Sequence, residues 1–295
     1  MRAAVRDDDK YSGRVIFTAD SWGDFMTQSE YRELQKVIDD HMDRYYNQDA
    51  PVISDYEYDQ LMLQLKEAEK EHPEWVTKDS PTQKIGGTAR REAGVKVTHD
   101  VPMLSIEDVF SKEEVTAWVD KVRARYPDAV FSVEVKVDGL SMSVRYEKGQ
   151  DGRLHLTLAE SRGDGLVGED VTANARVIPD VPETIDLSCD SLELRGEVYM
   201  THEAFEAYNR EMEAQGKKEA ANPRNLAAGT LRQLNPSITR KRGLRMFIFN
   251  VQRGPSELME HHGAALDLLA QKGVPVVFHR LCRNAAEVNA AIDAI

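Results

Sequence analysis

A lysine with a carboxylate two positions away on either side lies in VEVKVDG, the segment from Val133 to Gly139. The alternation predicts a strand with Glu134, Lys136 and Asp138 on one face and the valines on the other. Three charges are costly to gather on one face of a well-packed sheet unless that face borders a cavity. The pattern therefore indicates a reactive amine in a pocket, although a solvent-facing strand with a salt-bridged lysine would have the same residues.

A second candidate segment is SRGDGLVGED, Ser161 to Asp170, with three glycines, one arginine and three acids. Glycines let the backbone approach a phosphate or ribose closely, and Arg162 could pair with a phosphate. An ordinary polar hairpin loop has the same composition. A dinucleotide-binding Rossmann loop fits poorly, because no GxGxxG follows a strand and opens a helix.

Two later segments also carry patterned charge. LELRGE predicts a strand with Glu193, Arg195 and Glu197 on one face, which makes Glu197 a second carboxylate candidate for the pocket. Surface alternation is the alternative. Basic residues outnumber acidic ones between Asn222 and Arg245, which predicts either a surface that binds phosphate or DNA or an ordinary solvated face. Its cations are Arg224, Arg232, Arg240, Lys241, Arg242 and Arg245.

Composition restricts the class of protein. A chain of 295 residues with 41% hydrophobic and 30% charged residues is typical of a soluble globular protein. The net charge of -13 argues against bulk electrostatic binding of nucleic acid, so any such contact must be local. We expect a cytoplasmic chain, because membrane-length apolar runs and a secretion signal are missing. Cys189 and Cys282 are too few for a zinc tetrad and are expected to be reduced.

Two helices are predicted near the N-terminus. Residues 1–26 are polar and aperiodic and are expected to form a flexible extension. Thr27 with Glu30, and Ser54 with Glu57, have the spacing of a capping box. An apolar i, i+3, i+4 stripe follows each pair, which predicts a helical hairpin.

A loop rich in turn residues ends near Arg90, and short strands with connecting helices follow it. The chain therefore divides into a helical subdomain over 27–90 and an α+β domain over 91–295. Asp138-Gly139 is a strong tight-turn pair between the lysine strand and the next one. Predicted helices cover 112–125, 203–215, 256–272 and 285–295, and predicted strands cover 133–139, 140–147, 154–160, 192–200, 245–251 and a stretch from Val274.

The motif Lys136-Val137-Asp138-Gly139 resembles the KxDG signature of the covalent nucleotidyltransferases, which include DNA ligases, RNA ligases and mRNA-capping enzymes. The chain around it is similar to the NAD-dependent bacterial DNA ligases in seven collinear segments. These read YYNQDAPVISDYEYD, DSPTQKIGG, VPMLSIEDVF, VEVKVDGLSMSVRYEKG, ESRGDGLVGEDVTANARVIPDVP, LELRGEVYM and NPRNLAAGTLRQLNPSITRKR. The resemblance implies a helical hairpin followed by a nucleotidyltransferase (ATP-grasp-like ligase) domain of antiparallel sheets with flanking helices.

The resemblance also implies the chemistry. Lys136 would attack the α-phosphorus of NAD, release nicotinamide mononucleotide (NMN) and form lysyl-AMP. AMP would then pass to the 5′-phosphate of a DNA nick, which the 3′-hydroxyl seals in replication and repair. Glu134 and Asp138 alone would stabilise the unreactive ammonium. Magnesium (or manganese) on the phosphates and nearby arginines would have to offset them.

Site residues follow from the same resemblance. Glu134 would contact the adenine, Ser105 and Ile106 would lie beside the nucleotide, and Glu197 and Arg162 would lie near the ribose. The remaining candidates for nucleotide contact are Asp138, Gly139, Arg224 and Arg232.

The helical hairpin would recognise the NMN half through Tyr45, Tyr46, Asp55, Tyr58 and Asp59. Helical spacing puts Asp55, Tyr58 and Asp59 on one face, and aromatic rings with carboxylates suit a cationic nicotinamide. In the alternative interpretation Tyr58 belongs to the core stripe and the two aspartates favour the helix dipole. Many family members have His where Tyr46 stands.

The chain stops at Ile295, before the family's DGVVIK-type motif and its later domains, so we expect an N-terminal fragment with a truncated adenylation domain. Such a fragment would be limited to NAD binding and at most self-adenylation. Zinc would be needed only in the missing region, and nicked duplex DNA would be the partner of the full-length enzyme. A monomer without membrane contact is expected.

Three other functions compete with this one. An ATP-dependent ligase or capping-type transferase is disfavoured by the Tyr/Asp hairpin. A catalytically idle paralogue that only binds nucleotide stays open, and a Schiff-base lysine enzyme does not explain the collinear motifs.

Overall fold

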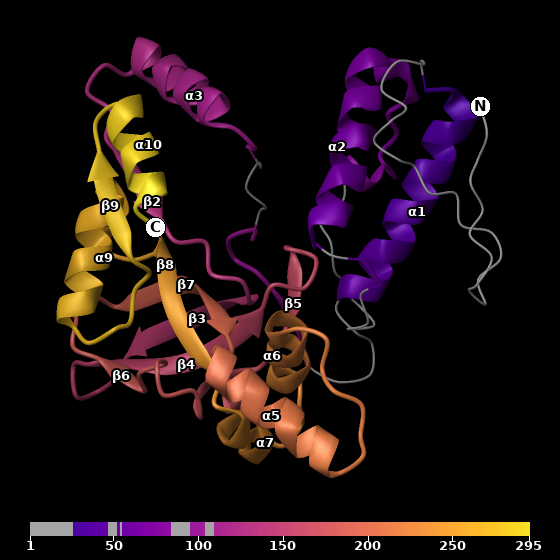
Figure 1. Ribbon diagram of the computed structural model, residues 1–295. Coiled ribbons are helices and arrows are strands. Elements are labelled where there is room, and N and C mark those ends of the chain that lie inside the picture. Colours follow the sequence, from indigo (N-terminus) through magenta and orange to yellow (C-terminus); the bar gives the residue numbers. More distant parts are fainter. Residues whose placement is uncertain (1–25, 47–51, 54, 84–94, 104–108) are drawn as a thin grey trace.

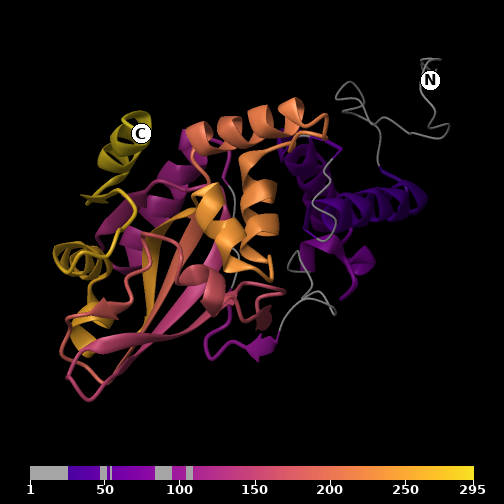
Figure 2. The same ribbon diagram turned by 90° about the horizontal axis from the view of Figure 1, so that it is seen from below.

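The computed structural model describes residues 26–46, 52–53, 55–83, 95–103 and 109–295. Figure 1 shows a pair of N-terminal helices to one side of a larger region built on β-sheets, and Figure 2 shows the same separation from below. The expected N-terminal extension, the helix cap at Ser54 and the boundary near Arg90 lie outside the described residues. The mixed α+β class with antiparallel sheets is confirmed.

The N-terminal helices pack on each other with a core of their own. They are α1 (Gln28–Tyr46) and α2 (Asp55–Glu71). The predicted capping box is present, since the Thr27 amide donates to Glu30 at 2.8 Å and the Glu30 amide donates to Thr27 Oγ1 at 3.3 Å. The predicted stripes meet in a buried cluster of Tyr31, Leu34, Ile38, Leu65 and Ala68. Two short 3₁₀ turns, η2 (Pro73–Trp75) and η3 (Pro81–Gln83), follow.

The larger region is organised by a five-stranded antiparallel sheet of order β6-β4-β3-β7-β8. Its strands are β3 (Leu140–Lys148), β4 (Leu154–Ser161), β6 (Thr184–Ile185), β7 (Ser191–Tyr199) and β8 (Arg245–Arg253). Alternation gives this sheet one apolar face and one polar face. The apolar face forms the main core, to which Val144 of β3, Leu194 of β7 and Ile248 of β8 contribute.

Helices cover the apolar face of this sheet. Leu226 and Leu231 of α6 (Pro223–Leu231), Ala175 of α4 (Thr172–Ala175) and Leu269 of α9 (His262–Gln271) belong to the same buried cluster. The other helices of this part are α5 (His202–Ala214), α7 (Pro236–Arg242) and α8 (Ser256–Glu260). The polar face is therefore left to carry charged side chains.

Two smaller ladders flank the large sheet. Strand β2 (Phe131–Glu134) pairs antiparallel with β9 (His279–Cys282). Together with α3 (Lys112–Arg125) and α10 (Ala285–Asp293) they enclose a separate small core around Val119, Phe131 and Cys282. Strand β1 (Lys96–Thr98) pairs antiparallel with β5 (Val167–Glu169).

The prediction of a continuous lysine strand is wrong. Strand β2 ends at Glu134, and residues 135–138 form a connection into β3 that belongs to no strand. Asp138-Gly139 is not a hairpin turn, because β2 pairs with β9 and β3 pairs with β4 and β7. Gly139 is required for another reason: a Cβ there would lie 2.1 Å from the Val198 carbonyl oxygen of β7. The glycine thus lets the connection cross closely over the sheet.

Other departures are local. The predicted helix over 256–272 is two helices, because His261 has an extended backbone between them (φ -131°, ψ 94°). The strand predicted from Val274 begins only at His279. Helices α6 and α7 were not predicted, although Asn222 and Asn235 cap them ahead of Pro223 and Pro236. No helix among the described residues has both the length and the apolar character needed to cross a bilayer.

Candidate active site

The connection between β2 and β3 carries Lys136 from the small ladder onto the polar face of the large sheet. Its first residue is fixed by a hydrogen bond from the Val135 amide to the Phe278 carbonyl, at 3.3 Å. Lys136 and Asp138 are exposed, whereas Gly139 is buried against β7. The lysine therefore has both a fixed main chain and an accessible side chain.

Glu197 of β7 lies beside this connection. Ser141, its register partner on β3, donates to Glu197 Oε2 at 2.7 Å. Burial raises the pKa of the Glu197 carboxyl above its ordinary value. The Ser141 hydrogen bond and the positive charges of Arg224 and Lys136 act in the opposite direction. Lys136, Glu197 and Arg224 are thus close enough to interact electrostatically.

Helix α6 brings an arginine to the same place. The Asn222 side chain caps the helix by accepting from the Asn225 amide at 2.8 Å, and Pro223 begins its first turn. Arg224 in that turn donates from Nη1 to Asp138 Oδ1 at 3.0 Å. The Asp138 carboxylate that follows the lysine in the KxDG motif is therefore already paired with a cation.

Glu134 lies at the end of β2 and has two partners. Ser132 donates to Glu134 Oε1 at 2.7 Å, and His262 Nε2, at the start of α9, lies 2.6 Å from the same oxygen. Burial alone would raise the pKa of Glu134, but the hydrogen bonds from His262 and Ser132 bring it below the ordinary value. The hydrogen bond to Glu134 raises the pKa of His262 in turn. Both carboxylates around Lys136 are thus partnered.

Arg162 follows β4 in a tight turn that we call the glycine turn, residues 162–166. Gly163 and Gly165 have left-handed φ values of 56° and 89°, which favour glycine. Arg162 donates from Nε to the Met103 carbonyl at 3.4 Å. The segment is the tight turn that connects β4 to β5, and these two glycines are explained by its backbone geometry.

Arg195 of β7 connects Arg162 with Glu197. Burial lowers the pKa of the Arg195 guanidinium, the nearby charge of Arg162 lowers it further, and Glu197 opposes both. The predicted shared face of Glu193, Arg195 and Glu197 is confirmed by the pairing of β7 with β3. The alternative, a row of charges facing solvent, does not hold for this strand, because Glu193 is only 1% exposed.

Arg232 lies apart from Arg224. It ends α6, eight residues after Arg224, which is about 12 Å along a helix axis. Its Nε is 4.0 Å from Glu169 Oε2 on β5. The predicted basic excess is also dispersed, since Lys241 pairs with Glu211 at 2.7 Å and Arg245 pairs with Asp180 at 2.6 Å.

The predicted NMN residues are described only in part. Tyr58 packs against the core of the helical hairpin, and Asp59 is half-buried on the same helix. The packing of Tyr58 agrees with the core-stripe interpretation and leaves its role toward a nucleotide untested. The side chains of Tyr45, Tyr46 and Asp55, and the whole of Ser105 and Ile106, lie outside the described residues.

Sequence reasoning missed Ser141, His262 and the site role of Arg195. Arg195 had a signal, because it alternates in phase with Glu197 on the same strand. His262 had none, since 128 residues separate it from Glu134. The site therefore joins the small ladder, the polar sheet face and the start of α6 around one accessible amine.

Comparison with known proteins matches both parts of the chain to families. The model of the NAD-dependent DNA ligase adenylation domain matches residues 92–295, and that of the DNA ligase-like, N-terminal NAD+-binding domain matches residues 26–86.

Curated proteins named DNA ligase are similar over most of the chain. One from Clostridium kluyveri is 45% identical over 263 residues, which is 88% of this chain and 39% of that protein. One from Acetivibrio thermocellus is 45% identical over 82% of this chain and 36% of its own length. One from Cereibacter sphaeroides is 43% identical over 88% of this chain and 37% of its own length. The chain thus spans less than two fifths of these relatives.

Proposed function

Because this chain belongs to the family of NAD-dependent DNA ligases, we propose that Lys136 accepts AMP from NAD in the first step of DNA ligation. The observation that supports this most strongly is the arrangement around the lysine connection. Arg224 binds Asp138 there, and Glu197 lies within electrostatic reach of Lys136. An exposed lysine beside these paired side chains can reach a nucleotide in the same place.

In the proposed step, the neutral Nζ of Lys136 attacks the α-phosphorus of NAD. A phosphorus–nitrogen bond forms, the bond from that phosphorus to the oxygen of NMN breaks, and the amine gives its proton to water. NMN leaves with the bridging oxygen. The lysyl-AMP that results keeps the phosphoryl group activated for transfer.

The pairing of the two neighbouring carboxylates supports a reactive amine. Unpaired, Glu134 and Asp138 would each place an uncompensated negative charge beside the attacking amine. His262 holds Glu134, and Arg224 holds Asp138. The lysine thus works beside two ion pairs, and Arg224 and Arg162 are the cations that we propose to stabilise the charge that develops on the phosphate.

We further propose that the helical hairpin binds the NMN half of NAD and that residues 27–90 and 91–295 act as two domains. The separate cores of the hairpin and of the sheet region support this division. Tyr58 and Asp59 on α2, with Tyr45, Tyr46 and Asp55, are the proposed contacts. Tyr58→Ala is expected to slow reaction with NAD and to spare sealing from a preformed adenylate, measured in the full-length protein.

The nucleotidyltransferase domain and its magnesium are part of the same proposal. Among the described residues no three His, Cys, Asp or Glu side chains gather to hold a metal ion. Magnesium usually binds through one or two carboxylates together with substrate phosphates. Asp138 and Glu197 supply oxygen ligands of that kind, and the ion would add charge neutralisation at the phosphates.

For the whole protein we propose sealing of nicked duplex DNA, in replication and repair, as a cytoplasmic monomer. The family membership supports the reaction. The net charge of -13 supports local rather than diffuse contact with DNA.

Intact-protein mass spectrometry tests the first step. The purified chain is incubated with magnesium and either NAD or ATP, and the mass is compared with that of Lys136→Ala and Lys148→Ala. Lys148 is the matched control, an exposed lysine at the far end of β3 that pairs with Asp190. We expect a gain of one AMP with NAD only, present in the wild type and Lys148→Ala and lost in Lys136→Ala.

Other results would be informative. A gain with ATP would place the chain in the other class of ligases. A gain that persists in Lys136→Ala would exclude this lysine as the nucleophile. If the mass stayed unchanged with both NAD and ATP, the purified chain would bind nucleotide at most and would not form lysyl-AMP.

A further inference from the structure

The glycine turn that carries Arg162 is held by a segment far away in sequence. The His99 amide donates to the Leu166 carbonyl at 2.9 Å, and the Met103 amide donates to the Gly165 carbonyl at 2.8 Å. Arg162 Nε returns a hydrogen bond to the Met103 carbonyl at 3.4 Å. The turn is therefore clamped along its length by residues 99–103.

The His99 side chain completes this clamp from inside the protein. Its imidazole is 1% exposed, and Nε2 lies 3.0 Å from the carbonyl oxygen of Arg162. A carbonyl can only accept, so Nε2 must carry a proton. Nδ1 lies 3.4 Å from Glu160 Oε1, a fully buried carboxylate. With an acceptor on each side, the imidazole is best satisfied as the doubly protonated cation.

The surrounding charges favour the same protonation state. Arg145 Nη2 lies 3.1 Å from Asp100, 3.6 Å from Glu160 and 3.4 Å from Glu193. Arg253 joins the same group, 3.2 Å from Asp100 and 3.1 Å from Glu193. Three carboxylates thus face two guanidiniums, and a charged His99 balances the charges of this network, in which Glu160, Glu193 and His99 are buried while Asp100 and Arg253 are half exposed.

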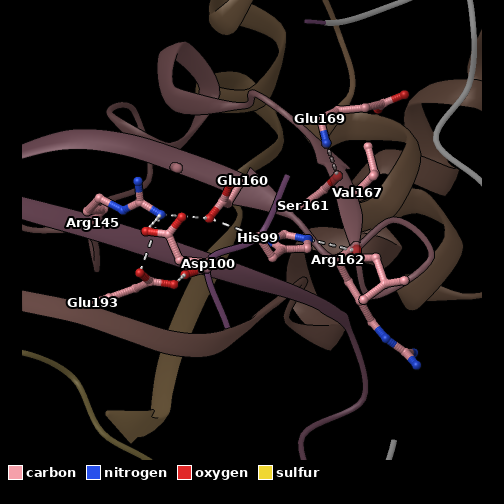
Figure 3. Close-up of polar contacts among 12 residues, drawn as sticks. His99, Asp100, Arg145, Glu160, Ser161, Arg162, Val167, Glu169 and Glu193 are labelled. Carbon is pink, nitrogen blue, oxygen red and sulfur yellow. Dashed lines mark hydrogen bonds and ion pairs between the residues drawn. The ribbon is translucent and has the colours of Figure 1, made fainter. Parts of the chain in front are cut away.

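Figure 3 shows how this network reaches the glycine turn at Arg162. His99 stands between Glu160 on one side and the Arg162 carbonyl on the other, while the Arg162 guanidinium points away from the network. A Cβ at Gly168 would lie 3.0 Å from His99 Nε2, so the backbone is shaped around the ring. The guanidinium in turn lies near Arg195, which interacts with Glu197.

We propose that His99 is a positioning residue for adenylate transfer, which fixes the Arg162 main chain and thereby the direction of the Arg162 guanidinium. The inference rests on the proposed function, because Arg162 is taken to face the nucleotide. His99 itself is buried and touches no substrate. Its charged imidazole links the carboxylate network to the glycine turn.

Hydrogen exchange tests whether His99 holds the glycine turn, and this measurement does not depend on enzymatic activity. His99→Gln keeps an amide donor near the position of Nε2, whereas His99→Ala removes it, and both are compared by mass spectrometry over residues 161–168. His155→Ala is the control, since His155 is an exposed histidine paired with Asp151. We expect exchange in the turn to be faster in His99→Ala by about fivefold, the effect of losing one hydrogen bond of ordinary net strength. His99→Gln and the control should keep wild-type exchange in the turn.

A double-mutant cycle tests whether His99 acts through Arg162. We expect His99→Ala to slow lysyl-AMP formation by about 10- to 100-fold, because a displacement of ~1 Å can cost on the order of 100-fold. His99→Gln should recover most of the rate. Added to Arg162→Ala, His99→Ala should slow the reaction little further.

Two outcomes would overturn the inference: unchanged exchange in the turn of His99→Ala, or fully additive losses in the cycle. Absence of any lysyl-AMP in the wild type would instead defeat the proposed function. The exchange experiment would then still decide whether His99 holds the turn.

Discussion

The polar face of the large sheet carries two charged clusters that differ in exposure. At one end, Lys136 and Asp138 are exposed and Arg224 is 24% exposed. At the other end, Glu160 and Glu193 are almost completely buried around Arg145. Strand β7 contributes to both clusters, since Glu197 faces Ser141 and Glu193 faces Arg145 on β3.

The difference indicates what each cluster can do. Exposed pairs gain little from each other in water, so a phosphate can replace a carboxylate as the partner of Arg224 at small cost. Buried pairs depend on complete mutual compensation, because an unpartnered buried charge is expensive. We conclude that the first cluster can rearrange around a ligand, while the second is a fixed support for it.

The largest expected effect is in the buried cluster. Arg145→Met would leave Glu160 and Glu193 without their shared cation and should lower the free energy of unfolding by about 3 to 5 kcal/mol. Chemical denaturation would measure it, with Arg210→Met as the control, since the Arg210–Glu206 pair is 67% exposed on both sides. A loss below about 1 kcal/mol would show that the buried cluster tolerates rearrangement like the exposed one.

The exposed cluster should respond in activity instead. Arg224→Ala removes the partner of Asp138, which is 58% exposed, so we expect a change in stability of at most about 0.5 kcal/mol. Lysyl-AMP formation should slow by about 100-fold, the usual effect of losing one group that stabilises transition-state charge. The rate of AMP incorporation measures this, and Arg123→Ala on the exposed side of α3 is the control. A large loss of stability would mean that Arg224 is structural.

The contrast also explains which features the sequence could predict. The alternation of Glu193, Arg195 and Glu197 predicted one face of β7, because both neighbours of that strand continue the sheet. The same alternation failed for Lys136, since β2 takes its partner from β9 and the chain then crosses to another sheet. The strand with which β2 pairs lies far away in the sequence, and the two-residue alternation of side chains carries no information about such a partner.

The same limit applies to single side chains. His99 meets the Arg162 carbonyl across 63 residues, and His262 meets Glu134 across 128. Local patterns cannot reveal either pair. Capping boxes and apolar stripes are local, and they predicted α1 correctly. The helix predicted over 112–125 also has the bounds of α3. The motif segments led to the candidate site because the family resemblance supplies the long-range information that composition lacks.

A smaller effect of opposite sign is expected at Glu197. Burial raises the pKa of this carboxyl, so its charged form is disfavoured in the folded protein at neutral pH. Glu197→Gln keeps an acceptor for Ser141 and should raise the free energy of unfolding at pH 7 by about 1 kcal/mol or less. The gain should vanish as pH falls below the ordinary glutamate pKa of about 4.3, where both variants are neutral. Thermal melts at the two pH values check it, and adenylation should fall in the same variant.

The smallest expected effect is a pH dependence at His99. The charged groups that face this imidazole are Asp100 beside it, Arg145 on β3, Glu160 on β4, Glu193 on β7 and Arg253 on β8. Burial would lower the pKa of His99, but the nearby Glu160 carboxylate and the hydrogen bond to the Arg162 carbonyl raise it above the ordinary value.

A base with a raised pKa contributes stability that is complete below its unfolded pKa of about 6.5 and is lost as pH rises through the folded value. The difference in unfolding free energy between the wild type and His99→Gln should therefore be largest below about pH 6.5 and should shrink at higher pH. Denaturation at a series of pH values measures this difference, with His155→Gln as the surface control. A difference that grows with rising pH would show that His99 is neutral in the folded protein. The buried cluster would then hold an uncompensated carboxylate, and its contrast with the exposed cluster would no longer rest on complete pairing.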